Sequence, residues 1–380
     1  MVVVKLPSFT WSSPTRVIFG AGELSRLGTL IEQVAGSQAR VFLVTGRRSL
    51  REQGVLQDVV DQIGNTRLTH FDQVTPFPSP QLVDTALEAC LAASPDVVVA
   101  IGGGSAIDVA KLVAILAAHQ GPASGYLSRE REIHRPGIPL IAVPTTSGSS
   151  SEVTPGAAVW DWEAKRSIGL GHPLMFPAAA IVDPDLAMSM PGTLAGVTGM
   201  DAFTSAFESY WSLEAEPFSD ALNLEVIRLY AANLEASCTR GDRESRSWCA
   251  LAATMSGMAY SNSHPNVCHA IGSPLTLFWG VDHGQSVGIT LPALLCWTAP
   301  AISAKLPALW EAMGVGDLEQ ATERLTQIMQ VSGLKTRLHD LGIGDGDVET
   351  LLEHVRWDRL GALPRELEKN DLRGLIQELL

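Results

Sequence analysis

Apolar and polar positions along the chain divide it into two parts of different texture. In the first part, short runs of β-branched and other apolar residues alternate with helical patterns. Such runs are typical of strands that are buried on both faces of a sheet. The runs that we expect to form strands cover residues 40–45, 96–101, 138–144 and 179–183, and helical patterns cover residues 81–93 and 106–118 between them.

The alternation of strands and helices predicts a parallel, doubly wound sheet, because parallel neighbours need the crossover connection that a helix supplies. From about residue 191 the texture changes to long helical patterns, as over residues 220–236 and 244–260, with no strand pattern among them. We therefore predict an α/β dinucleotide-binding domain over residues 1–188 and an all-helical domain over residues 189–380.

Charge and cysteine content exclude several functional classes. The net charge of −14 argues against a nucleic-acid partner, because a phosphate backbone requires a basic surface, but it allows a small anionic substrate in a local basic pocket. The five cysteines form no CxxC pair, which predicts reduced thiols in a cytoplasmic protein. No apolar run reaches the roughly 18 residues that a membrane helix requires, so we expect no membrane partner.

A glycine-rich turn follows the second expected strand. Gly102, Gly103, Gly104 and Ser105 connect that strand to a helix that carries Asp108. Glycines let a phosphate approach the backbone, and the helix N-terminus offers free N–H groups, so the turn can cradle a pyrophosphate. The spacing is not GxGxxG, so the standard dinucleotide fingerprint is absent, and a plain strand-to-helix turn is the alternative.

A hydroxyl-rich loop follows the third expected strand. Its side chains include Thr145, Thr146, Ser149 and Ser151. Ligands bind at the carboxyl ends of strands in open α/β sheets, and hydroxyl groups suit phosphate or ribose oxygens. A solvated loop without a ligand is the alternative, but the two loops together predict a dinucleotide site.

The residues after the first expected strand indicate which dinucleotide binds. An acidic residue at this place holds the 2′-hydroxyl of the adenine ribose in many nucleotide folds. Here Gly46 is followed by Arg47, Arg48 and Ser49. Arginine suits a 2′-phosphate, so we predict NADP(H) in preference to NAD(H), with an exposed basic pair at a helix start as the alternative.

A carboxylate and two imidazoles suggest a metal site in the second domain. Asp201 lies early in a helical pattern over residues 199–208, and His269 and His283 follow in segments rich in small residues. This donor set fits a divalent ion such as Zn(II) or Fe(II). A fourth ligand is expected one helical turn after Asp201, but Ser205, a poor ligand, occupies that position.

These segments resemble the iron-containing (group III) alcohol dehydrogenase family. The resemblance covers most of the chain and rests on residues 18–22, 102–111, 144–154, 181–184, 198–202, 268–270 and 282–284. It implies the dehydroquinate synthase-like fold, with the active site between the two domains, and a nicotinamide-dependent alcohol or aldehyde oxidoreductase. It also implies that Asp201, His269 and His283 bind the metal and that Lys165 lies near the cofactor ribose.

Shorter segments resemble the phosphonoacetaldehyde reductase branch of that family. They comprise residues 154–155, 158–161, 208–212 and 266–276. The resemblance implies reduction of phosphonoacetaldehyde to 2-hydroxyethylphosphonate during phosphonate natural-product, and hence antibiotic, biosynthesis. Because a phosphonate needs positive charge or donors near its oxygens, Arg166, His172 and His264 are candidate substrate contacts. Family members are often dimers, so a homodimer is the expected assembly.

The family places a histidine where this chain has Ser205, and three explanations stay open. Asp201, His269, His283 and a water could hold the metal, with an open position for substrate. His264 could supply the missing ligand. Alternatively, metal binding is lost, and Ser205 with neighbouring donors stabilises the alkoxide by hydrogen bonds.

Rival functions stay open as well. The chain could be a dehydrogenase of the same family that acts on a neutral aldehyde. It could be a lyase or synthase on the related dehydroquinate synthase-like fold, although the segments named above argue against this. It could also be a cofactor-binding protein with a degenerate metal site and no activity.

Overall fold

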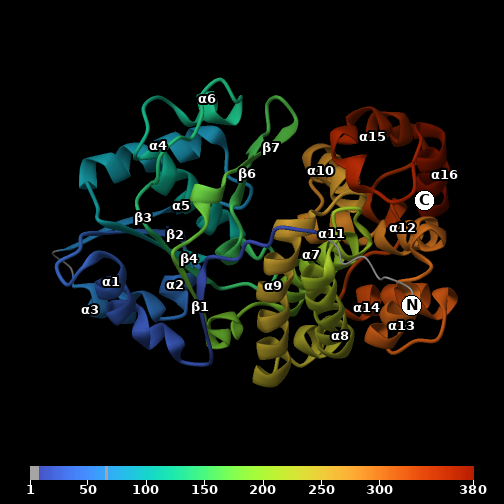
Figure 1. The fold of residues 1–380 in the computed structure, drawn as a ribbon, viewed down its shortest axis with the longest axis horizontal. Helices are drawn as coiled ribbons and strands as arrows, with labels where there is room; N and C mark the ends of the chain where they lie inside the picture. The colour runs from blue at the N-terminus through green and yellow to red at the C-terminus, as the bar shows by residue number, and fades with distance from the viewer. Residues whose placement is uncertain (1–7, 65–66) are drawn as a thin grey trace.

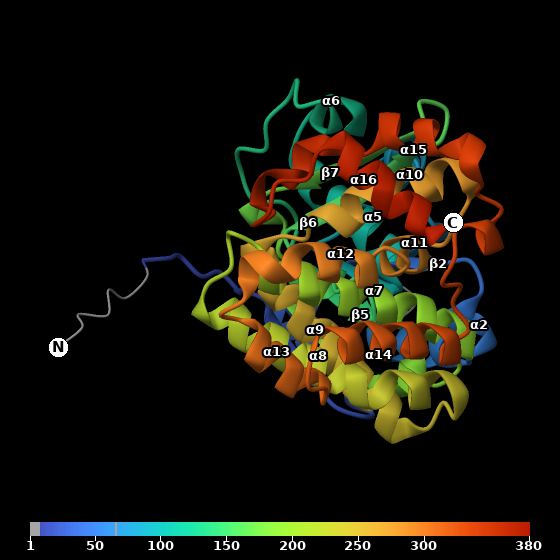
Figure 2. The same ribbon diagram turned by 90° about the vertical axis from the view of Figure 1, so that its right-hand side faces the viewer.

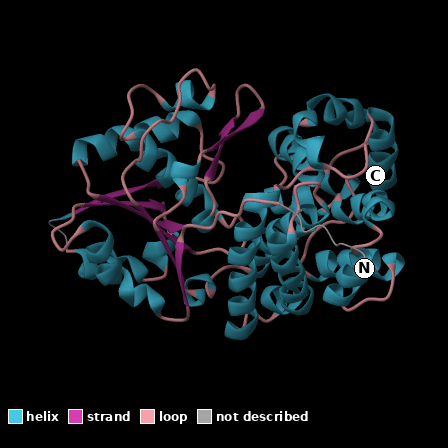
Figure 3. Cartoon of the chain, in the orientation of Figure 1, coloured by secondary structure: helices cyan, strands magenta, loops and turns pink. Residues whose placement is uncertain are grey.

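The chain folds into an α/β part and a helical part that lie side by side (Figure 1). The computed structural model describes residues 8–64 and 67–380. Every strand among these residues lies in the α/β part, and the other part consists of helices and loops (Figure 3). This arrangement confirms the predicted fold class.

A six-stranded sheet forms the centre of the α/β part, in the order β1-β8-β5-β4-β2-β3. Every pair of neighbouring strands is parallel. The expected strands appear as β2, β4, β5 and β8, whereas β1 and β3 were not expected. The bounds are β1 (Arg16–Phe19), β2 (Val41–Gly46), β3 (Leu68–Val74), β4 (Val97–Gly102), β5 (Leu140–Pro144) and β8 (Ala179–Val182).

Helices cover both faces of the sheet, as its apolar strands require. Side chains alternate between the faces of a strand. Phe42 and Val44 therefore pack in the core with α4 and α5, while Val41 and Leu43 pack in the core on the other face, with α1 and α3. The covering helices are α1 (Leu27–Ala35), α3 (Val55–Ile63), α4 (Pro80–Ala93) and α5 (Gly104–Leu116), with the short α2 (Ser49–Glu52) and α6 (Ala123–Leu127) nearby.

An antiparallel hairpin, which the sequence did not predict, extends from the α/β part. It consists of β6 (Gly156–Asp161) and β7 (Arg166–Gly171). The hairpin projects toward the helical part, where β7 packs against α10 (Figure 1). The hairpin therefore links the α/β part to the helical part.

The helical part surrounds one large apolar core, to which its helices contribute (Figure 2). Asp201 lies in the middle of α7, which begins at Gly192, earlier than the sequence pattern indicated. The helices are α7 (Gly192–Trp211), α8 (Pro217–Thr239), α9 (Arg243–Ser263), α10 (Val267–Trp279), α11 (His283–Gly288), α12 (Leu291–Thr298), α13 (Leu306–Met313), α14 (Leu318–Val331), α15 (Val348–His354) and α16 (Lys369–Leu379).

One helical stretch within the described residues, His283–Ile302, has the length and hydropathy of a membrane-spanning helix. However, 67% of its apolar window is buried inside the molecule. Its first residue is also one of the expected metal ligands. We therefore interpret this stretch as a core element of the helical part.

Candidate active site

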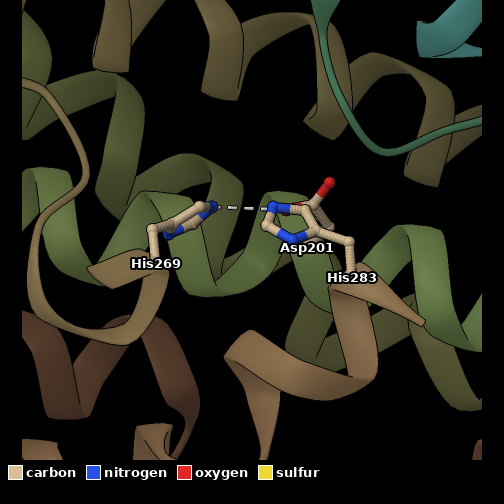
Figure 4. Close-up of side chains that lie close together, drawn as sticks. All are labelled: Asp201, His269 and His283. Atoms are coloured by element: carbon tan, nitrogen blue, oxygen red, sulfur yellow. Dashed lines mark ion pairs between the residues drawn. The ribbon is translucent and has the colours of Figure 1, made fainter. Parts of the chain in front are cut away.

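Three helices bring together the side chains that the sequence singled out as metal ligands. Asp201 comes from the middle of α7, His269 from the first turn of α10, and His283 from the first residue of α11 (Figure 4). One ligand atom from each residue lies within 4.8 Å of the others. The Nε2 atoms of His269 and His283 are 3.4 and 3.8 Å from the same Asp201 oxygen.

A buried carboxylate orients His269. The Nδ1–H of His269 donates to Glu208, which leaves Nε2 facing Asp201. The other oxygen of Glu208 accepts from the backbone N–H groups of Asn266 and Cys268, at 3.1 and 2.6 Å. Burial alone would lower the pKa of His269, but the Glu208 and Asp201 carboxylates outweigh it and raise that pKa to about 9.

Glu208 was not among the site residues that the sequence motifs indicated. A signal was present, because Glu208 follows Asp201 by two helical turns and so lies on the same face of α7. Glu208 is fully buried, and a buried carboxylate requires a partner. A carboxylate that fixes the ring of a metal-binding histidine is a common feature of metal sites.

Ser205 lies beside the candidate metal ligands, at the position expected for a fourth ligand. Its buried Oγ is 3.5 Å from Nε2 of His269. A hydroxyl there can approach His269, but it is shorter than an imidazole and a weaker metal ligand. Ser273, on α10, donates instead to the backbone carbonyl of His269, at 3.1 Å.

His283 has free capacity for a ligand. Its Nδ1 atom is buried without a hydrogen-bond partner among the described residues. Trp160, from the hairpin, meets its ring edge to face, with ring centroids 5.8 Å apart. Burial is the main cause that lowers the pKa of His283 to about 4, so this histidine is held in the neutral form that binds metals.

The donor set therefore fits a divalent metal. It offers a carboxylate oxygen, an imidazole nitrogen fixed by Glu208 and a second, neutral imidazole. Three protein ligands with one open position is the usual composition of a catalytic zinc site. His264 is not part of the group, because its Nδ1 atom bonds to Glu214 at 2.8 Å and its side chain is largely exposed.

The glycine turn and the hydroxyl loop contact each other. Gly104 begins α5, and a Cβ atom at this position would lie 2.3 Å from Oγ of Ser149. A Cβ atom at Gly103 would lie 3.4 Å from Oγ1 of Thr146. The backbone N–H of Thr145 donates to the backbone carbonyl of Gly102 at 3.0 Å. The free helix N-terminus thus adjoins the loop hydroxyls, an arrangement that fits a dinucleotide pyrophosphate.

Other expected cofactor residues bond within the protein. Asp108 accepts from Oγ of Ser151 at 2.5 Å and from the backbone N–H of Ala158 at 2.9 Å. Ser105 accepts from the backbone N–H of Phe77 at 3.3 Å. The structure thus gives these side chains a part in holding the hydroxyl loop and the hairpin in place beside α5.

The helical part fixes the hydroxyl loop against α7, the helix that carries Asp201. Tyr260, on α9, donates to the carbonyl of Ser149 at 2.5 Å, and Ser150 donates to the carbonyl of Ala253 at 2.5 Å. A Cβ atom at Gly148 would lie 2.6 Å from the carbonyl oxygen of Thr198, one turn before Asp201 on α7. The expected cofactor loop therefore packs directly against the helix that carries Asp201.

The residues after β2 are available to a ligand. Gly46 ends β2 next to the glycine turn, with its nitrogen 4.0 Å from the Cβ position of Gly102. Arg47, Arg48 and Ser49 are exposed, and neither arginine side chain has a hydrogen-bond or ion-pair partner among the described residues.

The remaining candidates bond elsewhere. Lys165, at the hairpin turn, donates to the carbonyl of Leu277 on α10 at 2.9 Å and so bridges the two parts. Arg166 lies 3.4 Å from Asp161 and is largely exposed. Nδ1 of His172 accepts from the backbone N–H of Leu174 at 3.2 Å.

Comparison with known proteins assigns the family. Residues 14–184 match the family described as iron-containing alcohol dehydrogenase, and residues 195–380 match its C-terminal counterpart, Fe-containing alcohol dehydrogenase family, C-terminal. The chain belongs to the iron-containing alcohol dehydrogenase family. Alcohol/aldehyde dehydrogenase activity, the activity of this family, accords with the site described above.

Several relatives match along nearly their whole length. The chain is 30% identical to long-chain-alcohol dehydrogenase 1 of Geobacillus thermodenitrificans, over 92% of each chain. It is 29% identical to lactaldehyde reductase of Escherichia coli, over 93% of this chain and 95% of that one. Its fold matches sulfoacetaldehyde reductase from Bifidobacterium kashiwanohense in complex with NAD+, with a TM-score of 0.92 and 25% identity, over 98% and 99% of the two chains.

Proposed function

We propose that this iron-containing alcohol dehydrogenase reduces phosphonoacetaldehyde to 2-hydroxyethylphosphonate with NADPH, as a cytoplasmic step of phosphonate natural-product biosynthesis. The observation that carries the proposal is the packing of the hydroxyl loop against α7, with the Cβ position of Gly148 2.6 Å from the carbonyl of Thr198. That contact puts the hydroxyl loop, which we expect to bind the cofactor, next to the turn of α7 that leads to Asp201. A structural neighbour that acts on sulfoacetaldehyde, an aldehyde with an anionic group on the adjacent carbon, supports the choice of substrate.

When bound, the nicotinamide supplies the hydride and the divalent ion supplies a Lewis acid. Asp201, His269 and His283 would hold the ion, and Glu208 keeps the proton of His269 on Nδ1 so that Nε2 stays available. Ser205 can donate a hydrogen bond toward negative charge that develops on the substrate oxygen. Trp160 packs edge to face against His283 from the hairpin side.

We propose NADPH as the cofactor on account of Arg47 and Arg48. Both side chains are exposed at the end of β2, where the adenine ribose binds in dinucleotide folds, and no acidic residue stands at Gly46. An arginine-to-phosphate hydrogen bond contributes about 1.5–3 kcal/mol. Arg47→Ala with Arg48→Ala should therefore raise the KM for NADPH by about tenfold or more and leave the KM for NADH nearly unchanged. Equal effects on both cofactors would contradict this assignment.

The substrate proposal is tested by comparing kcat/KM for phosphonoacetaldehyde, sulfoacetaldehyde and a neutral aldehyde of similar length. We expect phosphonoacetaldehyde to be reduced most efficiently. A preference for sulfoacetaldehyde would keep the anionic class and replace the phosphonate. A preference for the neutral aldehyde would favour the second candidate function, which the relative named lactaldehyde reductase supports.

A further inference from the structure

One arginine near the metal ligands lacks a partner. Arg359 lies in the 3-10 helix η9 (Trp357–Ala362) and is half-buried. Its guanidinium has neither a hydrogen bond nor an ion pair with any residue that the structure describes. Withdrawing a cation from water is costly unless an anion or acceptor compensates it, so an unpaired, half-buried arginine suggests a ligand.

The position of η9 is fixed by the elements that form the site. The backbone N–H of Arg356 donates to the carbonyl of Ala270, the residue after His269, at 3.2 Å. The side chain of Arg356 donates to the carbonyl of Ser167 on β7 at 3.1 Å. A Cβ atom at Gly169, also on β7, would lie 4.0 Å from Nη2 of Arg359. Arg359 therefore lies where η9, α10 and the hairpin meet, at the boundary between the two parts.

The hairpin links Arg359 to the metal-binding group. Trp160 meets the ring of His283 edge to face, with ring centroids 5.8 Å apart, and pairs across the hairpin with Ser167. The carbonyl of Ser167 accepts from the side chain of Arg356, on the segment that leads into Arg359. The strand that approaches Arg359 is therefore the partner of the strand that contacts His283.

The other cations along this boundary are engaged. Lys165 donates to the carbonyl of Leu277 at 2.9 Å, Arg356 pairs with Asp358 at 2.7 Å, and Arg166 lies 3.4 Å from Asp161. Arg359 differs from them in presenting a free planar fork of donors. That fork matches two oxygens of a tetrahedral oxyanion, which a lysine cannot contact in the same bidentate way.

We propose that Arg359 binds the tetrahedral oxyanion, phosphonate or sulfonate, on the carbon next to the substrate aldehyde, and so determines the preference for anionic aldehydes. This inference rests on the proposed function, since it names the residue that recognises the substrate class. Among the described residues, Arg359 is the cation at the junction of η9, α10 and the hairpin whose side chain has no partner, so it is the one available to an anionic substrate group.

The test uses the metal- and NADPH-supplemented enzyme and three variants. Arg359→Met removes the charge and keeps an apolar stem, Arg359→Lys keeps the charge without the fork, and Arg228→Met removes an exposed arginine that pairs with Glu225 on α8. For each protein, kcat and KM are measured with phosphonoacetaldehyde, sulfoacetaldehyde and a neutral aldehyde of similar length. The melting temperature and NADPH binding show whether each variant is folded.

We expect Arg359→Met to lower kcat/KM by about 10- to 100-fold for both anionic aldehydes, mainly through a higher KM. A loss of this size corresponds to the contribution of one hydrogen bond to a charged group. The neutral aldehyde should be unaffected, Arg359→Lys should recover part of the loss, and Arg228→Met should match the wild type. An equal loss for all three aldehydes, or no loss, would overturn the role of Arg359 while the proposed function stood. If Arg359→Met does not fold, the test uses Arg359→Lys. A fall in kcat/KM for the two anionic aldehydes, with no change for the neutral one, would then support the role of Arg359, and its absence would overturn it. A wild type that prefers the neutral aldehyde would overturn the proposed function and the inference with it.

Discussion

Two side chains on one face of α7 shape the surroundings of His269, one of the candidate metal ligands. Ser205 provides a hydroxyl 3.5 Å from Nε2 of His269, where an imidazole would complete a four-residue site. Glu208 binds the opposite nitrogen of the same ring and is itself held by two backbone N–H groups. The first leaves a coordination position open, and the second keeps the remaining histidine aligned.

Replacing Ser205 with histidine should restore a fourth ligand. The side chain would extend from α7 one turn after Asp201, toward Nε2 of His269. We expect Ser205→His to tighten the metal by at least about tenfold, or ~1.4 kcal/mol, in competition with a chelator. Ser205→Ala serves as the control and should leave the affinity close to that of the wild type. An unchanged affinity in Ser205→His would mean that position 205 does not face the ion.

Replacing Glu208 with glutamine should weaken the metal without removing a ligand. The amide keeps the shape but loses the charge that holds His269 with its proton on Nδ1. Mutation of such an outer partner costs about 10- to 100-fold in metal affinity or activity. Metal content after dialysis and kcat should both fall by this factor. Glu225→Gln, a change at an exposed residue of α8, is the matched control.

Among the elements, the strand-to-helix turn between β4 and α5 leaves no room for a side chain where it meets the hydroxyl loop. A Cβ atom at Gly104 would lie 2.3 Å from Oγ and 2.6 Å from Cβ of Ser149, so the two loops touch without space for a side chain. This contact explains why position 104 is a glycine.

Gly104→Ala should therefore displace the hydroxyl loop and weaken cofactor binding. Overpacking of a tight contact typically costs about 1–3 kcal/mol, which corresponds to roughly a tenfold or larger rise in the Kd for NADPH. Gly374→Ala on α16, where an added Cβ meets nothing within 4 Å, is the control and should bind NADPH normally. Equal binding by both variants, measured by quenching of protein fluorescence, would contradict the role assigned to the turn.

The elements also show what the sequence could and could not predict. Strands β2, β4, β5 and β8 are buried on both faces, so their continuous apolar runs were visible. β3 (Leu68–Val74) lies at the edge of the sheet and carries polar residues, and β1 has only four residues. In the β6–β7 hairpin, β6 has an apolar run of only four residues and β7 is largely exposed, and the place of the hairpin beside His283 depends on tertiary packing.

At the scale of the whole molecule, the site exists because the α/β part and the helical part are held together by specific contacts. Tyr260 and Ser150 attach the hydroxyl loop to α9, and Lys165 attaches the hairpin to α10. The sequence motifs indicated the loops and the ligands separately. Arg359 carries no motif, and its place beside the hairpin follows only from the way η9 packs on α10 and approaches β7.

The proposed reaction requires a metal that Asp201, His269 and His283 hold without a fourth histidine. The most direct measurement follows NADPH oxidation by phosphonoacetaldehyde with chelator-treated protein, before and after addition of Fe(II) or Zn(II). We predict that turnover is lost on chelation and returns with the metal, and that Asp201→Ala abolishes the recovery. Full turnover in the chelated protein would contradict the account and assign the stabilising role to Ser205 and its neighbours alone.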